Sequence, residues 1–352
     1  MTFKDAFQIA GVKVGANAPC YLIAEIGRNH NGDMGLAKQS IDAAVRAGAN
    51  AVKFQSFRAQ SLLIKELGSV SHVAETLGED KTIYDATKEV ELTEEAHFEL
   101  RDYANAKGIT FLSTPEDHDM VALLEKVGIP AFKVASLDIV YLDLLEAIAA
   151  TGKPIILSTG MAYLSEIETA LLVMERLGIE ELALLHCTSN YPPRDEDVHL
   201  RAMETLRKSF GVPVGYSDHT MGIGVSIAAT AMGADIIERH FTLDKDLPGP
   251  DHRISLTEAE FAQMEKEIRS VEKAMGSTIK RPCDAEMEMR RLHRRRLVAA
   301  RNLKIGQTLT RDDIACKCSA DGLEPRELTN LLGKRLKAGM AVDQPFTVNL
   351  VG

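Results

Sequence analysis

The sequence predicts an α/β protein whose main part is a (β/α)8 barrel of the TIM type. Short apolar or β-branched runs alternate with longer amphipathic stretches that end near glycine, which is the pattern of repeated strand–helix units. A doubly wound open sheet would give similar alternation with fewer repeats. Eight runs occur over roughly 250 residues, the length of one barrel. They span residues 21–27, 51–57, 109–115, 131–136, 154–160, 182–189, 213–219 and 236–242.

The first repeat illustrates the local signals behind this prediction. The run "YLIAEIG" is followed by "NHNGD", whose polar residues favour a helix start, and then by the helical pattern "MGLAKQSIDAAVRAG". Gly48 is placed to end that helix. The same order of strand, polar tip and helix recurs along the chain.

Composition limits the kind of protein and partner. The chain has 352 residues of which 45% are hydrophobic, enough for one large core and a smaller one, so we expect two domains. Its net charge of −10 argues against nucleic acid or an anionic membrane surface as the main partner. No run approaches the roughly 20 apolar residues of a membrane span, and "MTFKDAFQIA" lacks the core of a signal peptide. We expect a cytoplasmic protein whose five cysteines are reduced thiols.

Polar residues gather within and just after the predicted strands, and the C-terminal strand ends of a barrel form its active-site mouth. Lys133 interrupts the apolar run "AFKVAS", where an ammonium group without a partner would be costly. Lys53 and Lys133, with nearby hydroxyls, indicate a pocket for a small compound carrying phosphate and carboxylate. The alternative for each lysine is an ion pair with a neighbouring strand's carboxylate. The full set is Glu25, Lys53, Gln55, Thr114, Lys133, Ser136, Ser158, Thr188, Ser217, His219, Glu238 and His240.

Two histidines end successive strands and suggest a metal site. His219 in "YSDHT" and His240 in "ERHFT" should project toward the same side of the mouth. Two imidazole nitrogens with open positions suit a divalent ion that also holds water or a substrate oxygen and acts as a Lewis acid. The alternative is that both are hydrogen-bonded core histidines.

The chain resembles the sialic acid synthase family, which condenses phosphoenolpyruvate (PEP) with an N-acylated hexosamine to form a nine-carbon 2-keto acid. The motifs "AEIGRNHNG", "VKFQ", "FLSTPED", "KVAS", "ILSTGM", "HCTSNYP", "GYSDHT", "IERHFT" and "GPDH" occur in the family's order and spacing. After about residue 285 the chain is similar to the antifreeze-like (SAF, β-clip) domain that ends these enzymes. The resemblance implies a barrel at 1–284, an SAF domain with its linker at 285–352, and a domain-swapped homodimer.

The resemblance also implies roles for individual residues. Glu25 is implied as the residue that moves a proton, and His219 and His240 as ligands of Mn2+ or Mg2+. The residues implied to bind PEP are Lys53, Thr114, Lys133, Ser136, Ser158, Ser189 and Ser217. Those implied to contact the sugar are Gln55, Asp138, Tyr191 and Asp251.

Two departures from the family pattern concern sugar recognition. Asp138 stands where many members have glutamate, one methylene longer, and Cys318 stands where the SAF domain commonly carries an arginine that reaches the partner's sugar. The acceptor therefore stays open between N-acetylmannosamine and a 2,4-diacetamido-trideoxyhexose, although the "GPDH" turn favours sialate or legionaminate over pseudaminate as the product.

Two other classes of function stay open. One is a lyase that uses Lys53 or Lys133 as a Schiff base to cleave or build keto acids. The other is a non-catalytic carbohydrate-binding protein with an antifreeze-like module. The paired strand-end histidines argue against the lyase, and the combination of Glu25 with both lysines and both histidines argues against the binding protein.

Overall fold

The computed structural model describes residues 2–67 and 82–352. The chain forms two compact units, Met1–Gly276 and Ser277–Gly352. Each unit has its own hydrophobic core.

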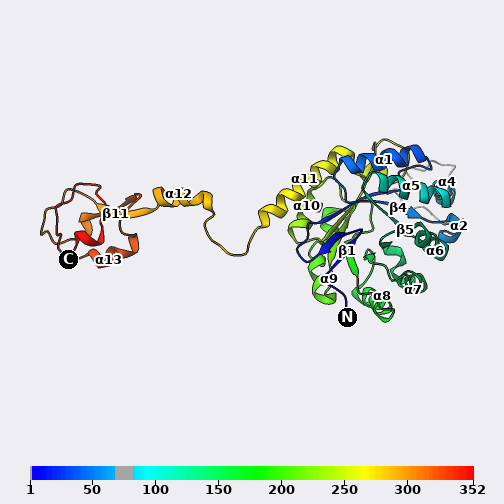
Figure 1. Ribbon diagram of the computed structural model, residues 1–352, viewed down its shortest axis with the longest axis horizontal. Coiled ribbons are helices and arrows are strands. Elements are labelled where there is room, and N and C mark those ends of the chain that lie inside the picture. Colours follow the sequence, from blue (N-terminus) through cyan, green and yellow to red (C-terminus); the bar gives the residue numbers. More distant parts are fainter. Residues whose placement is uncertain (1, 68–81) are drawn as a thin grey trace. The chain divides into compact units, whose positions relative to one another are not determined.

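The first unit is the predicted barrel of eight parallel strands (Figure 1). The strands are hydrogen-bonded in the order β5-β4-β3-β10-β9-β8-β7-β6, and β5 lies against β6, so the sheet is nearly closed and is not a doubly wound open sheet. Each strand lies within one of the eight runs identified in the sequence. Their bounds are β3 (Tyr21–Gly27), β4 (Ala51–Ser56), β5 (Thr110–Pro115), β6 (Phe132–Val134), β7 (Ile155–Ser158), β8 (Leu182–Cys187), β9 (Val214–Asp218) and β10 (Ile236–His240).

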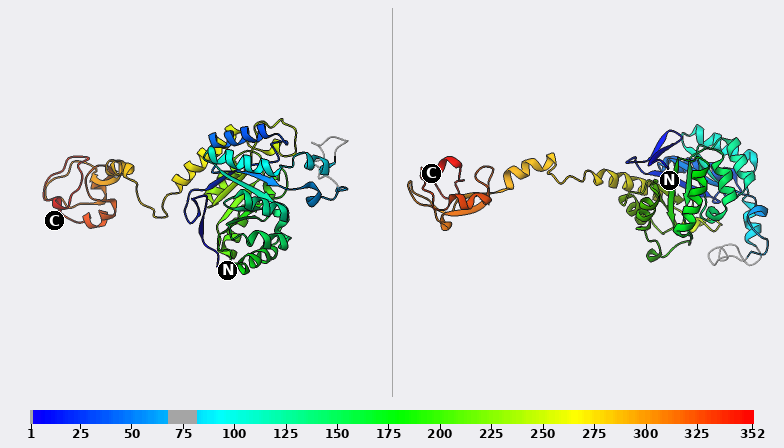
Figure 2. Two further views of the ribbon diagram at one scale, coloured as in Figure 1. Left: turned by 45° about the vertical axis from the view of Figure 1, so that its right-hand side comes forward. Right: turned by 90° about the horizontal axis from the view of Figure 1, so that it is seen from below.

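Helices form a layer outside the strands (Figure 2). The first begins after Asp33, whose side chain accepts hydrogen bonds from the Gly35 and Leu36 backbone N–H groups, as the capping signal in "NHNGD" predicts. The α-helices among the described residues of this unit are α1 (Met34–Arg46), α2 (Ala59–Leu62), α4 (Ile83–Glu89), α5 (Glu94–Ala106), α6 (His118–Val127), α7 (Leu142–Ala149), α8 (Leu164–Arg176), α9 (Ala202–Phe210), α10 (Gly224–Ala231) and α11 (Glu258–Met275).

Alternation along each strand separates two environments. In β10, Ile237 packs into the large core that the strands share with the helices, whereas Ile236 belongs to a smaller core with Tyr21 and Ile23 of the neighbouring strand. Side chains point to opposite faces at successive positions, so the residues that share a face with Ile236 are Glu238 and His240. The barrel interior is thus apolar at the start of β10 and polar toward its C-terminal end.

A hairpin that the sequence analysis did not predict precedes the barrel. Strands β1 (Ala6–Ile9) and β2 (Val12–Gly15) pair antiparallel. Phe7, Ile9 and Val14 belong to the same small core as the first interior residues of the barrel strands. The hairpin therefore packs at the N-terminal end of the barrel and leaves the other end for the polar residues.

The second unit is small and has its own apolar centre. It contains α12 (Asp284–His293), β11 (Arg295–Ala299), β12 (Ile314–Cys318) and α13 (Leu328–Leu331), and β11 pairs antiparallel with β12. Its core contains residues from both strands, such as Leu297 and Ile314, and from the later loops, such as Phe346. Cys316 and Cys318 are free thiols, as are the other cysteines of the chain, which agrees with the expectation from sequence.

Among the described residues, no helix is both long and apolar enough to cross a bilayer.

Candidate active site

The C-terminal strand ends surround a cavity of about 1050 Å³. The site residues implied by the family resemblance all line this cavity except Asp138, and Thr188, one of the predicted mouth residues, does not line it either. Those that line it are Glu25, Lys53, Gln55, Thr114, Lys133, Ser136, Ser158, Ser189, Tyr191, Ser217, His219, His240 and Asp251.

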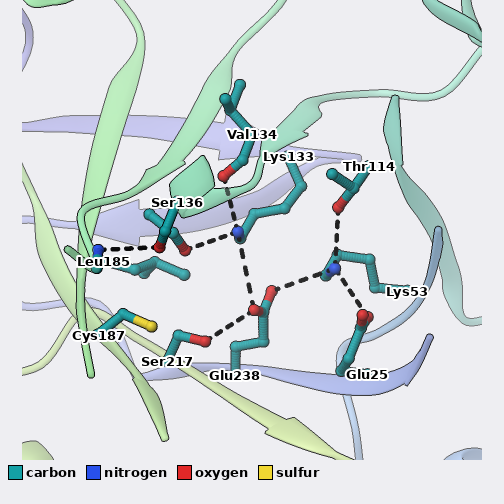
Figure 3. Close-up of polar contacts among 12 residues, drawn as sticks. Glu25, Lys53, Thr114, Lys133, Val134, Ser136, Leu185, Cys187, Ser217 and Glu238 are labelled. Atoms are coloured by element: carbon teal, nitrogen blue, oxygen red, sulfur yellow. Dashed lines mark hydrogen bonds and ion pairs between the residues drawn. The ribbon is translucent and has the colours of Figure 1, made fainter. Parts of the chain in front are cut away.

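Lys53 on β4 is buried and held by three oxygen-bearing side chains (Figure 3). Its Nζ lies 2.8 Å from Glu25 Oε2 and donates to Thr114 Oγ1 at 3.0 Å, while Glu238 Oε2 is 3.9 Å away. Burial by itself would lower the pKa of Lys53, but the carboxylates of Glu238 and Glu25 outweigh that effect and raise it. Lys53 is therefore a cation. Its ion pair with Glu25 is the alternative to ligand binding that the sequence analysis left open for each lysine.

Lys133 on β6 is equally buried but has weaker anionic support. Its Nζ donates to Ser158 Oγ at 2.7 Å and to the Val134 carbonyl at 2.9 Å, and Glu238 Oε1 lies 3.8 Å away. Burial lowers the pKa of Lys133. The negative charge of Glu238 acts to raise this pKa, and the positive charge of Lys53 acts to lower it further. The lysine that interrupts the apolar run thus meets two neutral oxygens at hydrogen-bond distance and a carboxylate at a longer range.

Glu238 on β10 lies between the two lysines, as Figure 3 shows. Its Oε1 also accepts a hydrogen bond from Ser217 Oγ at 3.0 Å. Burial acts to raise the pKa of Glu238, but the charges of Lys133 and Lys53 outweigh it and lower the pKa to about 2. One carboxylate therefore lies within 4 Å of both lysine ammonium groups and helps to balance their charge.

Glu25 on β3 accepts a second hydrogen bond, from Gln55 Nε2 to its Oε1 at 3.1 Å. Burial raises the pKa of Glu25 to about 7 in spite of the opposing charge of Lys53. A carboxyl group with such a pKa exchanges a proton near neutral pH, which is what general acid–base chemistry requires.

Two serines from different loops meet at Gly160, just after β7. The Gly160 backbone N–H donates to Ser136 Oγ at 2.9 Å. A Cβ atom at Gly160 would collide with the hydroxyls of Ser189 and Ser136, so only glycine lets them approach this backbone. The hydroxyls of Ser136, Ser158 and Ser189 all belong to the wall of the cavity near Lys133.

His219 and His240 lie side by side at the mouth, with ring centroids 5.4 Å apart. The Nδ1–H of His219 points to the Thr188 carbonyl at 3.1 Å, which leaves its Nε2 lone pair for a ligand. His240 Nδ1 is buried and has no hydrogen-bond partner among the described residues. Burial lowers the pKa of His240 and so favours the neutral ring that binds metal ions.

These two histidines fit a divalent cation as a partial ligand set. They would hold such an ion through Nε2 of His219 and through one ring nitrogen of His240. Within residues 2–67 and 82–352 there is no ready group of three or more His, Cys, Asp or Glu side chains for a metal. Further ligands would therefore have to come from water or a substrate.

Tyr191 and Asp251 lie near the histidines. The Tyr191 ring is 4.2 Å from that of His219 and 6.2 Å from that of His240, centroid to centroid. Asp251 raises the pKa of His240 through its charge, although burial has the larger, opposite effect. The predicted sugar contacts at these positions therefore face the same part of the cavity as the histidines.

Asp138 is placed differently from the other predicted residues. It lies in the 3-10 helix η1 (Ser136–Val140), is buried, and its Oδ2 has no hydrogen-bond partner among the described residues. Burial, together with the charge of Glu116, raises the pKa of Asp138 to about 7. Its proposed contact with a sugar stays a prediction.

Several residues of the cavity wall have no role in the sequence analysis, among them Arg28, Glu116 and Cys187. Glu238 is among the predicted mouth residues, but the sequence analysis gives it no role of its own. Glu238 shares the interior face of β10 with His240. The two-residue period of a strand therefore indicates that Glu238 points into the barrel. Cys187 ends β8, and its Sγ lies 3.8 Å from His219 Nδ1. Arg28 and Glu116 follow the ends of β3 and β5, where loop conformation rather than strand alternation sets direction.

Comparisons with known proteins give a consistent result. The model of the NeuB family matches residues 40–280, and that of the SAF domain matches residues 294–351. The chain is 41% identical to N,N'-diacetyllegionaminic acid synthase of Legionella pneumophila, over 95% of each chain. It is 34% identical to N-acetylneuraminate-9-phosphate synthase of Homo sapiens, over 96% of this chain and 94% of the relative. The crystal structure of N-acetylneuraminic acid (sialic acid) synthetase from Leptospira borgpetersenii, in complex with citrate, superposes with a TM-score of 0.72 at 37% identity, covering 81% of this chain and 94% of that one.

The raised pKa of Asp138 predicts a pH-dependent effect of Asp138→Asn on stability. The ordinary pKa is 3.8 and the folded value is about 7, so between these values the folded state keeps a proton that the unfolded state loses. Wild-type stability therefore falls as pH rises through this window. The stability of the variant relative to wild type should rise with pH by up to about 4 kcal/mol and level off above pH about 7.

Urea unfolding at several pH values measures this effect, with Asp119→Asn, an exposed aspartate on α6, as the matched control. A stability difference for Asp138→Asn that does not change with pH would contradict the assignment of a raised pKa.

Proposed function

The chain belongs to the NeuB family, and on this premise we propose that it condenses PEP with an N-acylated hexosamine, giving a nonulosonic acid and phosphate. Its relatives make it an enzyme of the sialic acid synthase type. The observation that carries the proposal is the pair of buried lysines, Lys53 and Lys133, facing one cavity with hydroxyls around them. Such a group binds a small anion with several oxygens.

PEP is the anion that this part of the cavity suits. Its phosphate and carboxylate would accept hydrogen bonds from the two ammonium groups and from nearby hydroxyls. As PEP binds, its oxygens would compete with the long contacts that Glu238 makes, at 3.9 Å to Lys53 and 3.8 Å to Lys133. The proposed PEP ligands are Lys53, Thr114, Lys133, Ser136, Ser158, Ser189 and Ser217.

The proposed reaction forms one carbon–carbon bond and breaks one carbon–oxygen bond. C3 of PEP attacks the C1 aldehyde of the open-chain sugar, whose oxygen takes up a proton, and positive charge develops at C2. Water adds at C2 and loses a proton, and the resulting intermediate expels phosphate by C–O cleavage to leave the 2-keto acid. The lysines stabilise the negative charge that grows on the departing phosphate.

Glu25 is the group we assign to proton movement. It faces the cavity beside Lys53 and lies next to His240 across the β3–β10 pairing, so it reaches the region between the anion site and the histidines. A divalent cation, Mn2+ or Mg2+, held by His219 and His240 would supply Lewis-acid polarisation of the sugar aldehyde. The acceptor would then lie against Gln55, Tyr191 and Asp251.

The acceptor, the quaternary structure and the location stay predictions. N-acetylmannosamine and a 2,4-diacetamido-trideoxyhexose are the two acceptor candidates, and the relatives include synthases of both kinds of product. The domain-swapped homodimer and the cytoplasmic location rest on the sequence alone.

Phosphate release across a panel of acceptors tests the proposed function. With PEP and Mn2+, one of the N-acylated hexosamines should give phosphate and a 2-keto acid in equal amounts. PEP without a sugar serves as the control. No sugar-dependent phosphate release from any member of the panel would contradict the proposal.

Lys133→Met tests the PEP site because it keeps the length and apolar bulk of the side chain but removes its charge. Losing a charge-assisted contact worth roughly 2–4 kcal/mol should weaken PEP binding about 30- to 1000-fold. Titration calorimetry measures this, and Lys126→Met, an exposed lysine on α6, is the matched control. Unchanged PEP affinity would make Lys133 a purely structural residue.

His219→Ala and His240→Ala test the metal site. Each should lower Mn2+ occupancy, measured by electron paramagnetic resonance, and abolish turnover without loss of fold, and EDTA should act in the same way. His118→Ala, half exposed on α6, is the control. Turnover at the wild-type rate after exhaustive chelation would rule out the Lewis-acid role.

The Schiff-base lyase is the second candidate, because burial lowers the pKa of Lys133 and thereby favours a nucleophilic amine. Borohydride added with a keto-acid substrate would then trap an adduct on Lys133 or Lys53, which mass spectrometry detects. We expect no adduct.

A further inference from the structure

Arg28 is a cavity-wall residue to which the proposed reaction gives no role. It directly follows β3, and its side chain is 24% exposed. The guanidinium Nε donates to Gln55 Oε1 at 2.9 Å. Gln55 in turn donates to Glu25, which pairs with Lys53. A continuous chain of polar contacts therefore runs from Arg28 to the buried lysine.

The chemistry of the guanidinium fixes the direction of this chain. A guanidinium has donors and no acceptor, so the Gln55 side chain must turn its oxygen toward Arg28. The Gln55 NH2 group then necessarily faces the other way, where Glu25 Oε1 accepts from it. Without Arg28, the amide oxygen would lose its donor, and the contact with Glu25 alone would hold the Gln55 side chain in this orientation.

Arg28 is itself well fixed. Its guanidinium lies over the Phe57 ring, 4.5 Å from the centroid, and Nη1 donates to Thr87 Oγ1 at 3.3 Å. Nη2 lies 4.0 Å from Glu116 Oε2. A side chain held on several sides loses little freedom when it orients a neighbour, so Arg28 can act as a rigid support.

The backbone between Glu25 and Arg28 is adapted to this arrangement. The pairing of β3 with β4 shifts register between Glu25 and Gly27, and Gly27 has φ +54°. A Cβ atom at Gly27 would lie 3.0 Å from Glu25 Oε1 and 3.4 Å from Gln55 Nε2. Glycine at this position leaves room for the contact between the carboxylate and the amide.

We propose that Arg28 is a positioning residue that fixes the amide orientation of Gln55 and through it holds the Glu25 carboxylate in place. This inference rests on the proposed function of Glu25. It predicts that Arg28 matters for turnover more than for PEP binding, because the chain acts on Glu25 directly. Lys133 lies outside the chain, and Lys53 keeps its hydrogen bond to Thr114.

Arg28→Met should therefore lower kcat by about 10- to 100-fold, the range expected for the loss of one charge-assisted hydrogen bond, with little change in PEP affinity. Arg28→Lys should recover part of the loss, because an ammonium group also donates to Gln55 Oε1. Thr87→Val removes the hydrogen bond from Arg28 Nη1 to Thr87 Oγ1 without touching Gln55 and should have a much smaller effect.

A double-mutant cycle separates action through Gln55 from a general structural role. In a Gln55→Met background, Arg28→Met should cause little further loss of kcat, because the group that it orients is already gone. Wild-type kcat in Arg28→Met, or losses that multiply in the double variant, would overturn the inference while the proposed function stands.

The same cycle measured by urea unfolding does not depend on turnover. A favourable coupling between Arg28 and Gln55 is expected, and a coupling of zero would overturn the inference even if wild-type protein failed to turn over any sugar. Absence of sugar-dependent turnover in wild type, by contrast, would count against the proposed function alone.

Discussion

Two buried ammonium groups share one buried carboxylate at the centre of this barrel, and the rest of the site is arranged around them. Lys53 and Lys133 both lie within 4 Å of Glu238. Removing one partner from a buried ion pair leaves an uncompensated charge, which is strongly destabilising. Glu238 and Glu25 face the same space as the two lysines and supply this compensation. A bound anion would exchange contacts within this group.

The strand alternation explains why most of this site could be predicted from the sequence. Parallel strands end at the same side of a barrel, and the interior residues of each strand follow a period of two. Lys53 and Gln55 share one face of β4, and Glu238 and His240 share one face of β10. The eight runs therefore predict the interior positions near the strand ends.

Other features could not be predicted because strand alternation does not control them. Arg28 lies beyond a register shift and a glycine with positive φ, so its direction depends on local backbone geometry. Asp138 lies in a 3-10 helix, where its distance from the cavity depends on how the helix packs. The N-terminal hairpin is short, and its strands, AFQI and VKVG, have only four residues each, too few for a clear alternating signal.

A crystal structure with PEP and Mn2+ bound tests the central claim most directly. The account predicts that the oxygens of PEP lie within hydrogen-bond distance of the Nζ atoms of Lys53 and Lys133, with Mn2+ between His219 and His240. PEP bound elsewhere, with both lysines still in contact only with protein oxygens, would contradict it.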